Sequence, residues 1–505
     1  MPAGRPTDPF ATGHLRDGLK RRAVRGGTLV LAAQGVKTAV QIVAIAVLAR
    51  LLTPSDFGLF AIVLALLTVL ELFKDLGLSS ATVQRAEITG RQVSTLFWLN
   101  IALGTAAAAL LVLAAPLLAQ SYGEQRLADL VPVVAISLVI GAAAAQHLAL
   151  LRRQMRFRAL VAVQTGSEIL SLCAALAAAW FGLGVWALVV QRVVWSALLS
   201  VGAMAASGWR PGLPGRLREV RGLVAFGVNA TGAMVLGRLS STVDKFLIGG
   251  AWGIAALGFF ERAQKLTMFP VQSINTPLSA IALPMLSRLS AEPDRYRRAY
   301  EAVVRPLAML LAPVSGLLCA AGGPVAEFVL GPQWGEAGAI LSWLGLSLFY
   351  MPITYTLSWL YMSQDRTGEM LGANAVNVAL TLAALFYALP FGVEAVAAAY
   401  ALTGALLRAP ILFLLAGRKG PVRFAQFPRL LGLPLLGLGA AAAAVWLCRI
   451  ATPVDTLAPV GQVPILAVIA ASAALCAYGL VPGGRAAIVD LLRLRRHLAR
   501  QEARA

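Results

Sequence analysis

The fold is decided by stretches such as STLFWLNIALGTAAAALLVLAAPLLA, residues 94–119, which contains no charged side chain. A helix rises about 1.5 Å per residue and the hydrocarbon core of a bilayer is about 30 Å thick, so about 20 apolar residues span it. The stretch is long enough for a transmembrane helix. It also lacks the alternation of apolar and polar residues that is typical of a barrel strand.

Similar segments recur along the chain and predict an all-α polytopic membrane protein with about 14 transmembrane helices. We expect them at 27–52, 58–78, 94–119, 128–150, 159–181, 184–206, 221–248, 255–285, 302–323, 337–361, 368–389, 393–416, 429–449 and 462–481. The segments 221–248 and 255–285 are longer than a bilayer requires and carry several charges, so we expect them to bend or to project.

The overall composition excludes a soluble protein. Hydrophobic residues make up 59% of the 505 residues and charged residues 13%, with 43 basic and 23 acidic residues and a net charge of +20. A soluble domain is about 25% charged, so this chain cannot cover a soluble surface. The surplus of basic residues does not indicate nucleic-acid binding, because the charges sit in short clusters between apolar runs. It favours contact with anionic membrane lipids.

The positions of the basic residues predict the orientation of the helices. About 34 of the 43 basic residues fall in the two tails and in alternate loops, about two in the opposite loops and about seven within the spans. Cytoplasmic loops are the basic ones, so both termini are predicted to be cytoplasmic. The first apolar segment follows a polar tail and lacks a small-residue cleavage site, so we expect a membrane helix there and not a signal peptide.

Known catalytic and metal-binding patterns are missing from the sequence. The four cysteines, Cys173, Cys319, Cys448 and Cys476, show no CxxC spacing, and the three histidines are far apart. Phosphate-binding loops, HExxH and Ser/His/Asp candidates are also missing. We therefore expect no catalytic residue, no metal, no cofactor and no ATP site, so that any active transport by this chain would have to use an ion gradient.

A weak internal repeat predicts two lobes of six helices each. The turn around Phe57-Gly58 has a counterpart at Leu257-Gly258, and the turn Phe181-Gly182 has one at Phe391-Gly392. Parallel repeats of this kind build transporters around a central cavity. The predicted organisation is an N-terminal tail, a first lobe, a linker, a second lobe, two accessory helices and a basic C-terminal tail: residues 1–26, 27–206, 207–220, 221–416, 417–481 and 482–505.

Polar residues within the predicted spans are the candidate functional residues, because an ionisable group in a bilayer costs several kcal/mol without a partner. Lys37 and Gln41 share one helical face, which favours either a cationic cavity contact or an interhelical hydrogen-bonding stripe. Glu168 and Arg192 lie on either side of a tight hairpin at depths about 7 Å apart. We expect a structural ion pair, with a proton-titrating Glu168 as the alternative.

Two further groups of candidates lie in the two long segments. The substrate-cavity candidates there are basic or amide side chains suited to an anionic, sugar-bearing ligand: Arg238, Lys245, Arg262, Lys265, Gln272 and Asn275. Asp244 and Glu261 either neutralise these cations or couple transport to an ion, as Glu168 would.

Several stretches resemble the polysaccharide transporter branch of the multidrug/oligosaccharidyl-lipid/polysaccharide exporter superfamily, and in particular the Wzx-type flippases. The resemblance covers roughly residues 20–420. It rests on Ala49-Arg50-Leu51-Leu52-Thr53-Pro54-Ser55-Asp56-Phe57-Gly58-Leu59-Phe60, Asp75-Leu76-Gly77-Leu78-Ser79-Ser80-Ala81, Ser94-Thr95-Leu96-Phe97-Trp98-Leu99-Asn100, Gly182-Leu183-Gly184-Val185-Trp186, Leu283-Pro284 and Leu330-Gly331-Pro332-Gln333-Trp334.

This resemblance implies a flippase of the bacterial inner membrane with alternating access. Its substrate would be an undecaprenyl-pyrophosphate-linked oligosaccharide, moved from the inner to the outer leaflet, and candidate partners are a glycan polymerase and other polysaccharide-assembly proteins. A drug/ion antiporter of the same superfamily is the alternative, but it predicts an acidic cavity. A membrane glycan polymerase or glycosyltransferase is less favoured, because such enzymes usually carry a large outer loop and this chain has none.

Overall fold

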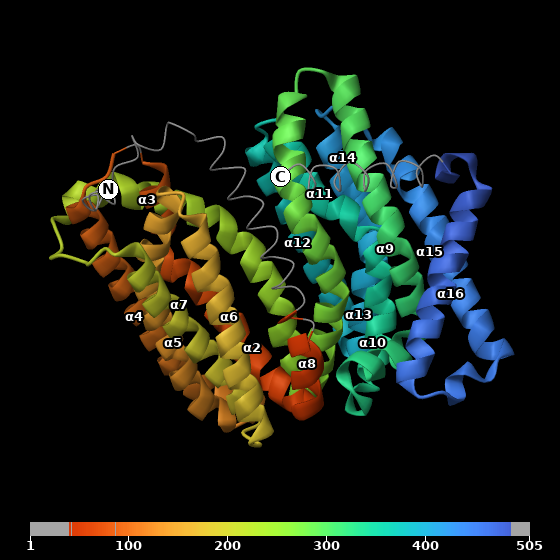
Figure 1. The fold of residues 1–505 in the computed structure, drawn as a ribbon, viewed down its shortest axis with the longest axis horizontal. Coiled ribbons are helices and arrows are strands. Elements are labelled where there is room, and N and C mark those ends of the chain that lie inside the picture. Colours follow the sequence, from red (N-terminus) through yellow and green to blue (C-terminus); the bar gives the residue numbers. More distant parts are fainter. Residues whose placement is uncertain (1–39, 42, 86, 486–505) are drawn as a thin grey trace, which may run out of the picture. The chain divides into compact units, whose positions relative to one another are not determined.

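The structure is a computed structural model of the 505-residue chain and describes residues 40–41, 43–85 and 87–485. These residues form helices, turns and bends, with no strand among them (Figure 1). The predicted all-α membrane fold is confirmed. The chain divides into two compact units, Met1–Gly258 and Phe259–Ala505, and we describe each by itself.

The first unit is a bundle of long helices that follow one another along the chain. Its helices are α2 (Pro54–Asp75), α3 (Leu78–Gln84), α4 (Gly90–Tyr122), α5 (Arg126–Arg153), α6 (Phe157–Trp180), α7 (Trp186–Ser207), a 3-10 turn (Leu217–Val220) and the first part of α8 (Arg221–Arg288). Apolar side chains of α2, α4, α5 and α7 form one buried cluster, which includes Leu59, Leu111, Val131 and Val189.

The sequence before α2 explains why that helix begins at Pro54. The Thr53 hydroxyl accepts a hydrogen bond from the Asp56 backbone N–H at 3.3 Å, and the Asp56 carboxylate accepts one from the Thr53 N–H at 3.0 Å. This is a reciprocal cap, and a proline in the first turn costs nothing because its missing N–H has no helical partner. The stretch Thr53-Pro54-Ser55-Asp56 therefore sets the start of α2.

Two glycines of the sequence repeat, Gly58 in α2 and Gly258 in α8, lie at a close approach of backbones. A Cβ atom on Gly58 would lie 1.9 Å from the carbonyl oxygen of Ile254, and one on Gly258 would lie 1.9 Å from that of Pro54. The contact is reciprocal: position 58 meets position 254, and position 258 meets position 54. The structure therefore gives the repeated glycines a shared packing role within the first unit.

Helix α8 also contains the break between the two predicted segments 221–248 and 255–285. The backbone of Gly253 is non-helical, with φ 84° and ψ 171°, a conformation that residues with a Cβ rarely adopt. The two segments are therefore two helical parts of α8 that meet at a kink at this glycine. The expectation that these segments bend is confirmed at this residue.

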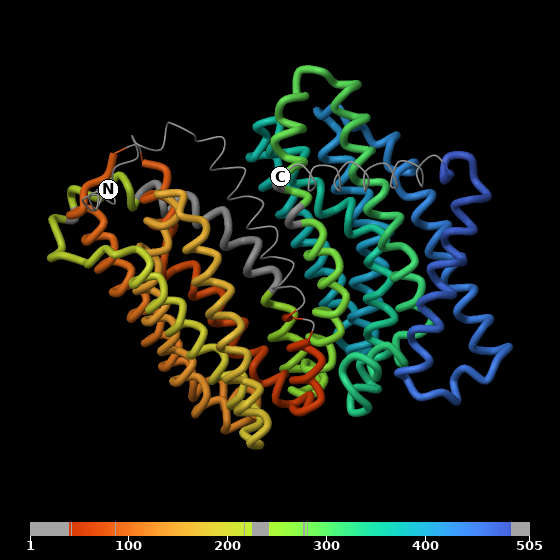
Figure 2. Tube along the Cα trace, in the orientation of Figure 1, coloured from red at the N-terminus to blue at the C-terminus, as the bar shows by residue number. Residues whose placement is uncertain are grey.

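The second unit continues from α8 with helices that are often interrupted. They are α9 (Pro293–Leu330), α10 (Ala337–Gly345), α11 (Met351–Met362), α12 (Thr367–Ala388), α13 (Val393–Thr403), a π-helical turn (Gly404–Arg408), α14 (Ala409–Gly417), α15 (Phe427–Ala451) and α16 (Pro459–Leu480). Short 3-10 turns occur at Pro332–Trp334, Leu346–Phe349, Leu389–Phe391, Phe424–Gln426 and Pro453–Thr456. Figure 2 shows α15 and α16 side by side at the C-terminal end of the described chain.

Small residues allow the helices of the second unit to approach closely, as is usual for helices packed in lipid. A Cβ atom on Gly316 of α9 would lie 2.7 Å from the Ala441 Cβ of α15, and one on Gly345 would lie 2.5 Å from the Leu318 Cβ. The buried Tyr478 hydroxyl of α16 donates a hydrogen bond to the Met309 carbonyl of α9 at 3.0 Å. The last two helices are thus packed against α9.

Eleven helices of the described residues are long and apolar enough to cross a membrane, or 12 if α10 and α11, bent by 45°, count as one span. The predicted number of 14 is not confirmed. The first predicted span, 27–52, lies mostly outside the described residues, and α8, which holds the segments 221–248 and 255–285, contributes the single candidate span Thr242–Asn275. The lobe boundary predicted at 207–220 stays a prediction. Along the chain, the first compact unit ends at Gly258 and the second begins at Phe259.

Candidate functional site

The first unit contains a half-buried charged cluster made by α2 and α7. The Glu71 carboxylate forms ion pairs with the Arg192 guanidinium and with the Lys74 ammonium, the latter at 3.3 Å. The side chains of Lys74 and Arg192 are 14% and 15% exposed, and that of Glu71 is 28% exposed. Two cations share one carboxylate, so the cluster carries one surplus positive charge.

This cluster corrects the ion pair expected between Glu168 and Arg192. Arg192 contacts Glu71, and its guanidinium also lies 4.9 Å from the centroid of the Trp195 ring. The physical reason is that Glu168 and Arg192 lie at different depths on either side of their hairpin, whereas the Glu71 carboxylate of α2 lies within reach of the Arg192 guanidinium. Glu71 and Lys74 are not among the sequence candidates, and their contact with α7 is a finding of the structure.

Glu168 instead lies beside another candidate. The Gln41 side-chain amide donates a hydrogen bond to the Glu168 carboxylate at 3.2 Å, so the structure brings these two sequence-selected residues together. Lys37 and the side chain of Arg238 lie outside the described part of the structure. Their assignment to a substrate cavity stays a prediction.

Several of the motif residues near the end of α2 form a polar network. The Asp75 carboxylate accepts hydrogen bonds from the Ser79 hydroxyl at 2.7 Å and from the Asn100 amide at 3.2 Å. Asn100 accepts one from Gln146 at 2.8 Å, and Gln146 accepts one from Thr82 at 2.7 Å. The network joins α2, α3, α4 and α5, so these motif residues act first as structural contacts at a helix corner.

The candidates on α8 fall in both units. The Arg262 guanidinium makes two hydrogen bonds to the Glu261 carboxylate, at 2.9 and 2.6 Å, and both residues are buried. This favours the reading in which Glu261 neutralises its neighbour. Asp244 accepts a hydrogen bond from the Lys245 backbone at 2.9 Å.

The remaining candidates on α8 belong to the second unit. Lys265 and Gln272 are exposed and Asn275 is half-buried. The amide oxygen of Asn275 is buried without a hydrogen-bond partner, and Gln272 forms a side-chain hydrogen bond with Tyr355 of α11. Gln272 is thus the α8 candidate that contacts α11.

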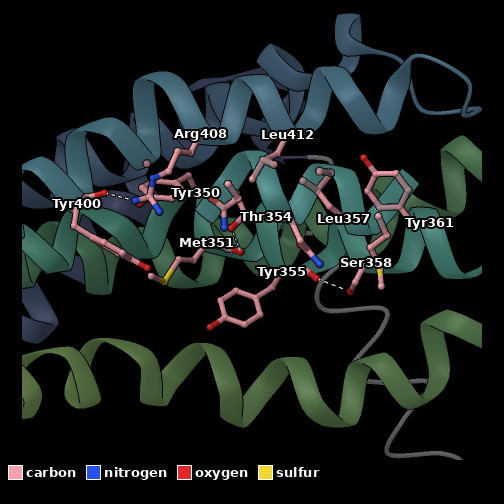
Figure 3. A pocket seen from close by; sticks show the side chains of 15 residues that line it. Tyr350, Met351, Thr354, Tyr355, Leu357, Ser358, Tyr361, Tyr400, Arg408 and Leu412 are labelled. Carbon is pink, nitrogen blue, oxygen red and sulfur yellow. Dashed lines mark hydrogen bonds between the residues drawn. The ribbon is translucent and has the colours of Figure 1, made fainter. Parts of the chain in front are cut away.

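The second unit has a partly open pocket of about 350 Å³ between α11, α12, α13, the π-helical turn and α14 (Figure 3). Hydroxyl and amide groups line it together with one charged side chain, that of Arg408. The lining residues are Tyr350, Met351, Thr354, Tyr355, Leu357, Ser358, Tyr361, Met370, Ala373, Asn374, Asn377, Tyr400, Gly404, Arg408 and Leu412. None of these lining residues is among the candidates selected from the sequence.

Arg408 is a buried charged residue of this pocket that the sequence candidates omitted. It is 6% exposed, donates to the Thr381 hydroxyl at 2.9 Å and to the Tyr400 carbonyl, and its guanidinium lies 4.4 Å from the centroid of the Tyr400 ring. The signal that could have found it is a lone arginine inside the predicted segment 393–416, where an ionisable group calls for a partner or a use.

The fold and these buried charges define a polytopic helical membrane protein with a transporter architecture. The chain is similar in fold to the lipid II flippase MurJ in an inward closed conformation, with a TM-score of 0.71 and 13% identity over 89% of this chain and 98% of that one. An inward-facing multidrug resistance MATE family transporter of the MOP superfamily matches with a TM-score of 0.57 and 15% identity, over 75% and 93% of the two chains.

Residues 47–339 match the family described as polysaccharide biosynthesis protein, and the chain belongs to this family. Its relatives include the teichuronic acid biosynthesis protein TuaB of Bacillus subtilis (strain 168), 28% identical over 61% of this chain and 64% of that protein. The succinoglycan biosynthesis transport protein ExoT of Rhizobium meliloti (strain 1021) is 26% identical over 60% and 62%. The chain thus spans a little under two thirds of the length of these two relatives. The predicted resemblance to the exporter superfamily is confirmed.

Proposed function

We propose that the protein is a flippase of bacterial polysaccharide biosynthesis. Its substrate would be an undecaprenyl-pyrophosphate-linked oligosaccharide, moved from the inner to the outer leaflet of the cytoplasmic membrane by alternating access. Membership of the polysaccharide biosynthesis family over residues 47–339 carries the proposal. The ExoT relative is named as a transport protein, and the MurJ fold is that of a lipid flippase. Both support transport over catalysis.

The charge distribution also supports this substrate class. A pyrophosphate carries at least two negative charges, and moving them through hydrocarbon without partners would cost many kcal/mol. The first unit supplies a surplus cation in the Glu71, Lys74 and Arg192 cluster, and the second supplies Arg408. A drug/ion antiporter that carries hydrophobic cations would instead favour negatively charged side chains in its cavity.

The energy source in this proposal is a proton or sodium gradient. Glu168, Asp244 and Glu261 are the candidate coupling groups, and Glu168 has Gln41 beside it. The protein would lie in the inner membrane with both termini in the cytoplasm, and a glycan polymerase and other assembly proteins would receive its product at the outer leaflet. No nucleic acid or resident cofactor enters this scheme.

Reconstituted vesicles test the proposal directly. The purified full chain is placed in liposomes with a fluorescently tagged undecaprenyl-pyrophosphate oligosaccharide, and an impermeant reductant reports which leaflet holds the tag. We expect protein-dependent exposure of the tag, and we expect this exposure to be lost in Lys245→Ala and in Arg262→Ala. Arg126→Gln, a matched change at an exposed arginine, should expose the tag as the wild type does.

Three outcomes would count against the proposal. Gradient-driven drug efflux without movement of the tagged lipid would favour the antiporter, whose fold the chain also shares. Polymerised or glycosylated product would favour an enzyme. In cells, normal surface glycan after neutralising Lys37, Arg192, Arg238, Lys245, Arg262 and Lys265 together would overturn the cationic cavity.

A further inference from the structure

The chain between α7 and α8 includes a segment, residues 208–216, that lies along the side of α4 and that we call the strap (Figure 1). The Trp98 indole of α4 donates a hydrogen bond to the Gly212 carbonyl at 3.0 Å. The Ser94 hydroxyl, one turn earlier on α4, accepts a hydrogen bond from the Gly212 N–H at 3.0 Å. The strap is therefore bonded to the helix and does not extend freely into water.

Both flanks of the strap are fixed in the core of the first unit. Trp209 is buried, and its ring centroid lies 6.1 Å from that of Phe97 and 5.0 Å from that of His147. Val220, shortly after the strap, is buried in the same apolar cluster as Trp209. Because both flanks are fixed, the exposed middle of the strap keeps its position beside α4.

The bonds to α4 place the middle of the strap at the depth of the membrane surface. Arg91 is the last charged residue before the uncharged run of this helix, and Trp98 follows seven residues later, about 10 Å further along the helix axis. A Cβ atom on Gly215 would lie 3.0 Å from the Arg91 Nε, whereas Gly212 is bonded to Trp98. A headgroup layer is about 5–7 Å thick, so the strap reaches from the headgroups to the start of the acyl chains.

The backbone of the strap is suited to this apolar depth. Irregular backbone is rare in contact with lipid, because its polar groups find no water as a partner. Two of the residues 211–215 are prolines, which have no N–H, and two are glycines whose N–H groups donate to the Ser94 and Thr95 hydroxyls at 3.0 and 2.8 Å. Most of the donors that would oppose contact with lipid are therefore removed or satisfied.

The side chains of the strap are apolar in its middle and basic toward its ends. Leu213 is 88% exposed, and the ring of Trp98, which bonds to the neighbouring glycine, is 45% exposed. Arg210 and Arg216 lie on either side of Leu213, and both are exposed. An apolar residue between basic ones is typical of a segment that lies in the plane of the membrane interface.

The charge around the strap indicates which headgroup it contacts. Residues 208–221 contain Glu219 as their one acidic residue, against four exposed arginines: Arg210, Arg216, Arg218 and Arg221. None of these arginines forms an ion pair with another residue that the structure describes. Guanidinium groups bind phosphate oxygens in a bidentate way, and each basic residue near the surface favours an anionic lipid by about fivefold.

We infer that the strap is an interfacial anchor that binds anionic phospholipid headgroups through Arg210 and Arg216, with Leu213 inserted among the upper acyl chains. This site goes beyond the proposed function and requires no assumption about the transported substrate. It also gives Ser94 and Trp98, two residues of the motif 94–100, a shared role in holding the anchor.

A dye on the strap tests its depth. Native cysteines are replaced, Leu213→Cys carries a fluorescent dye, and the full chain is placed in nanodiscs. Lipids with a nitroxide on the upper acyl chain quench the dye from the membrane, and a water-soluble nitroxide quenches it from water. We expect quenching by the lipids and shielding from water at position 213. The same dye on Ser290→Cys, in the exposed turn between α8 and α9, should show the opposite pattern.

The choice of quenching lipid tests the headgroup. Nitroxide-labelled phosphatidylglycerol and phosphatidylcholine are compared at equal mole fraction, and we expect the dye at position 213 to favour phosphatidylglycerol. Arg210→Gln with Arg216→Gln should lower this preference about 5- to 25-fold, the range from one to two lost contacts. Arg295→Gln with Arg298→Gln, the same change of charge at exposed positions of α9, should leave it unchanged. The substituted arginines are all exposed, so both double variants should melt as the wild type does.

Three results would overturn the inference. Quenching from water as strong at position 213 as at position 290 would place the strap outside the membrane. Equal quenching by the two lipids, or a preference that survives Arg210→Gln with Arg216→Gln, would remove the anionic headgroup. Shielding of the dye from both lipid and water would assign Leu213 to a contact between copies of the chain.

Discussion

The close approach of Gly58 and Gly258 leads to the prediction that Gly258→Ala destabilises the first unit. The new Cβ atom would lie 1.9 Å from the Pro54 carbonyl oxygen and 2.7 Å from its carbon. Both are backbone atoms, so no side chain can rotate away. To reach an ordinary contact of 3.4 Å, α2 and α8 would have to separate by about 1.5 Å at this point.

The expected cost is near the upper end of the range for overpacking, about 3 kcal/mol. For a unit of 258 residues that unfolds cooperatively, this corresponds to a fall in Tm of about 5–10 °C. The measurement is thermal unfolding of the purified full chain in detergent, followed by tryptophan fluorescence. Gly250→Ala on the same helix is the control, because no atom lies within 4 Å of its new Cβ and alanine favours a helix over glycine.

A double variant sharpens the test. Gly58→Ala places a Cβ atom 1.9 Å from the Ile254 carbonyl oxygen, and it pushes apart the same two helices. Once they have separated, the second substitution should cost less, so the double variant should lose less stability than the two single variants added together. Equal melting of Gly258→Ala and Gly250→Ala, or strict additivity in the double variant, would refute the close backbone contact.

Three other outcomes are expected. Glu71→Gln leaves two half-buried cations without their carboxylate and should lower the unfolding free energy by about 1–3 kcal/mol. Glu124→Gln, at an exposed pair, should cost at most about 1 kcal/mol in the same melting assay. Equal losses of stability in the two variants would contradict the burial of the cluster. Tyr478→Phe removes one buried hydrogen bond and should cost about 1 kcal/mol by thermal unfolding, and an unchanged Tm would argue against that bond. In a background without native cysteines, an impermeant maleimide should label Thr456→Cys in intact cells and Ser290→Cys only after permeabilisation, and the reverse pattern would overturn the predicted orientation.

Much of the helical fold could be predicted from the sequence because the hydrophobic requirement for a membrane helix is local. An uncharged run such as 94–119 needs a bilayer for its length and internal hydrogen bonds for its backbone, whatever its neighbours are. The corresponding helix, Gly90–Tyr122, extends a few residues beyond the run at each end. The N-terminal cap of α2 could likewise be predicted from the sequence, because Thr53 and Asp56 lie three residues apart, the spacing of a capping box.

Breaks inside helices were harder to predict. The segment 337–361 contains a 45° bend between α10 and α11, and 393–416 contains the π-helical turn. Both segments are apolar throughout most of their length, so hydropathy does not distinguish a straight helix from an interrupted one. A Cβ atom at Gly404 in this turn would lie 1.8 Å from the hydroxyl oxygen of Tyr350, a residue between the 3-10 turn Leu346–Phe349 and α11.

The sequence by itself determined that this chain is a helical membrane protein of the polysaccharide biosynthesis family, and it singled out buried charges as the groups to explain. Only the tertiary structure decided how those charges are used. It paired Arg192 with Glu71 in place of Glu168, and it placed Arg408 in a pocket without a carboxylate. The reason is physical: the cost of a buried charge follows from its own helix, but its partner comes from a helix far away in the chain.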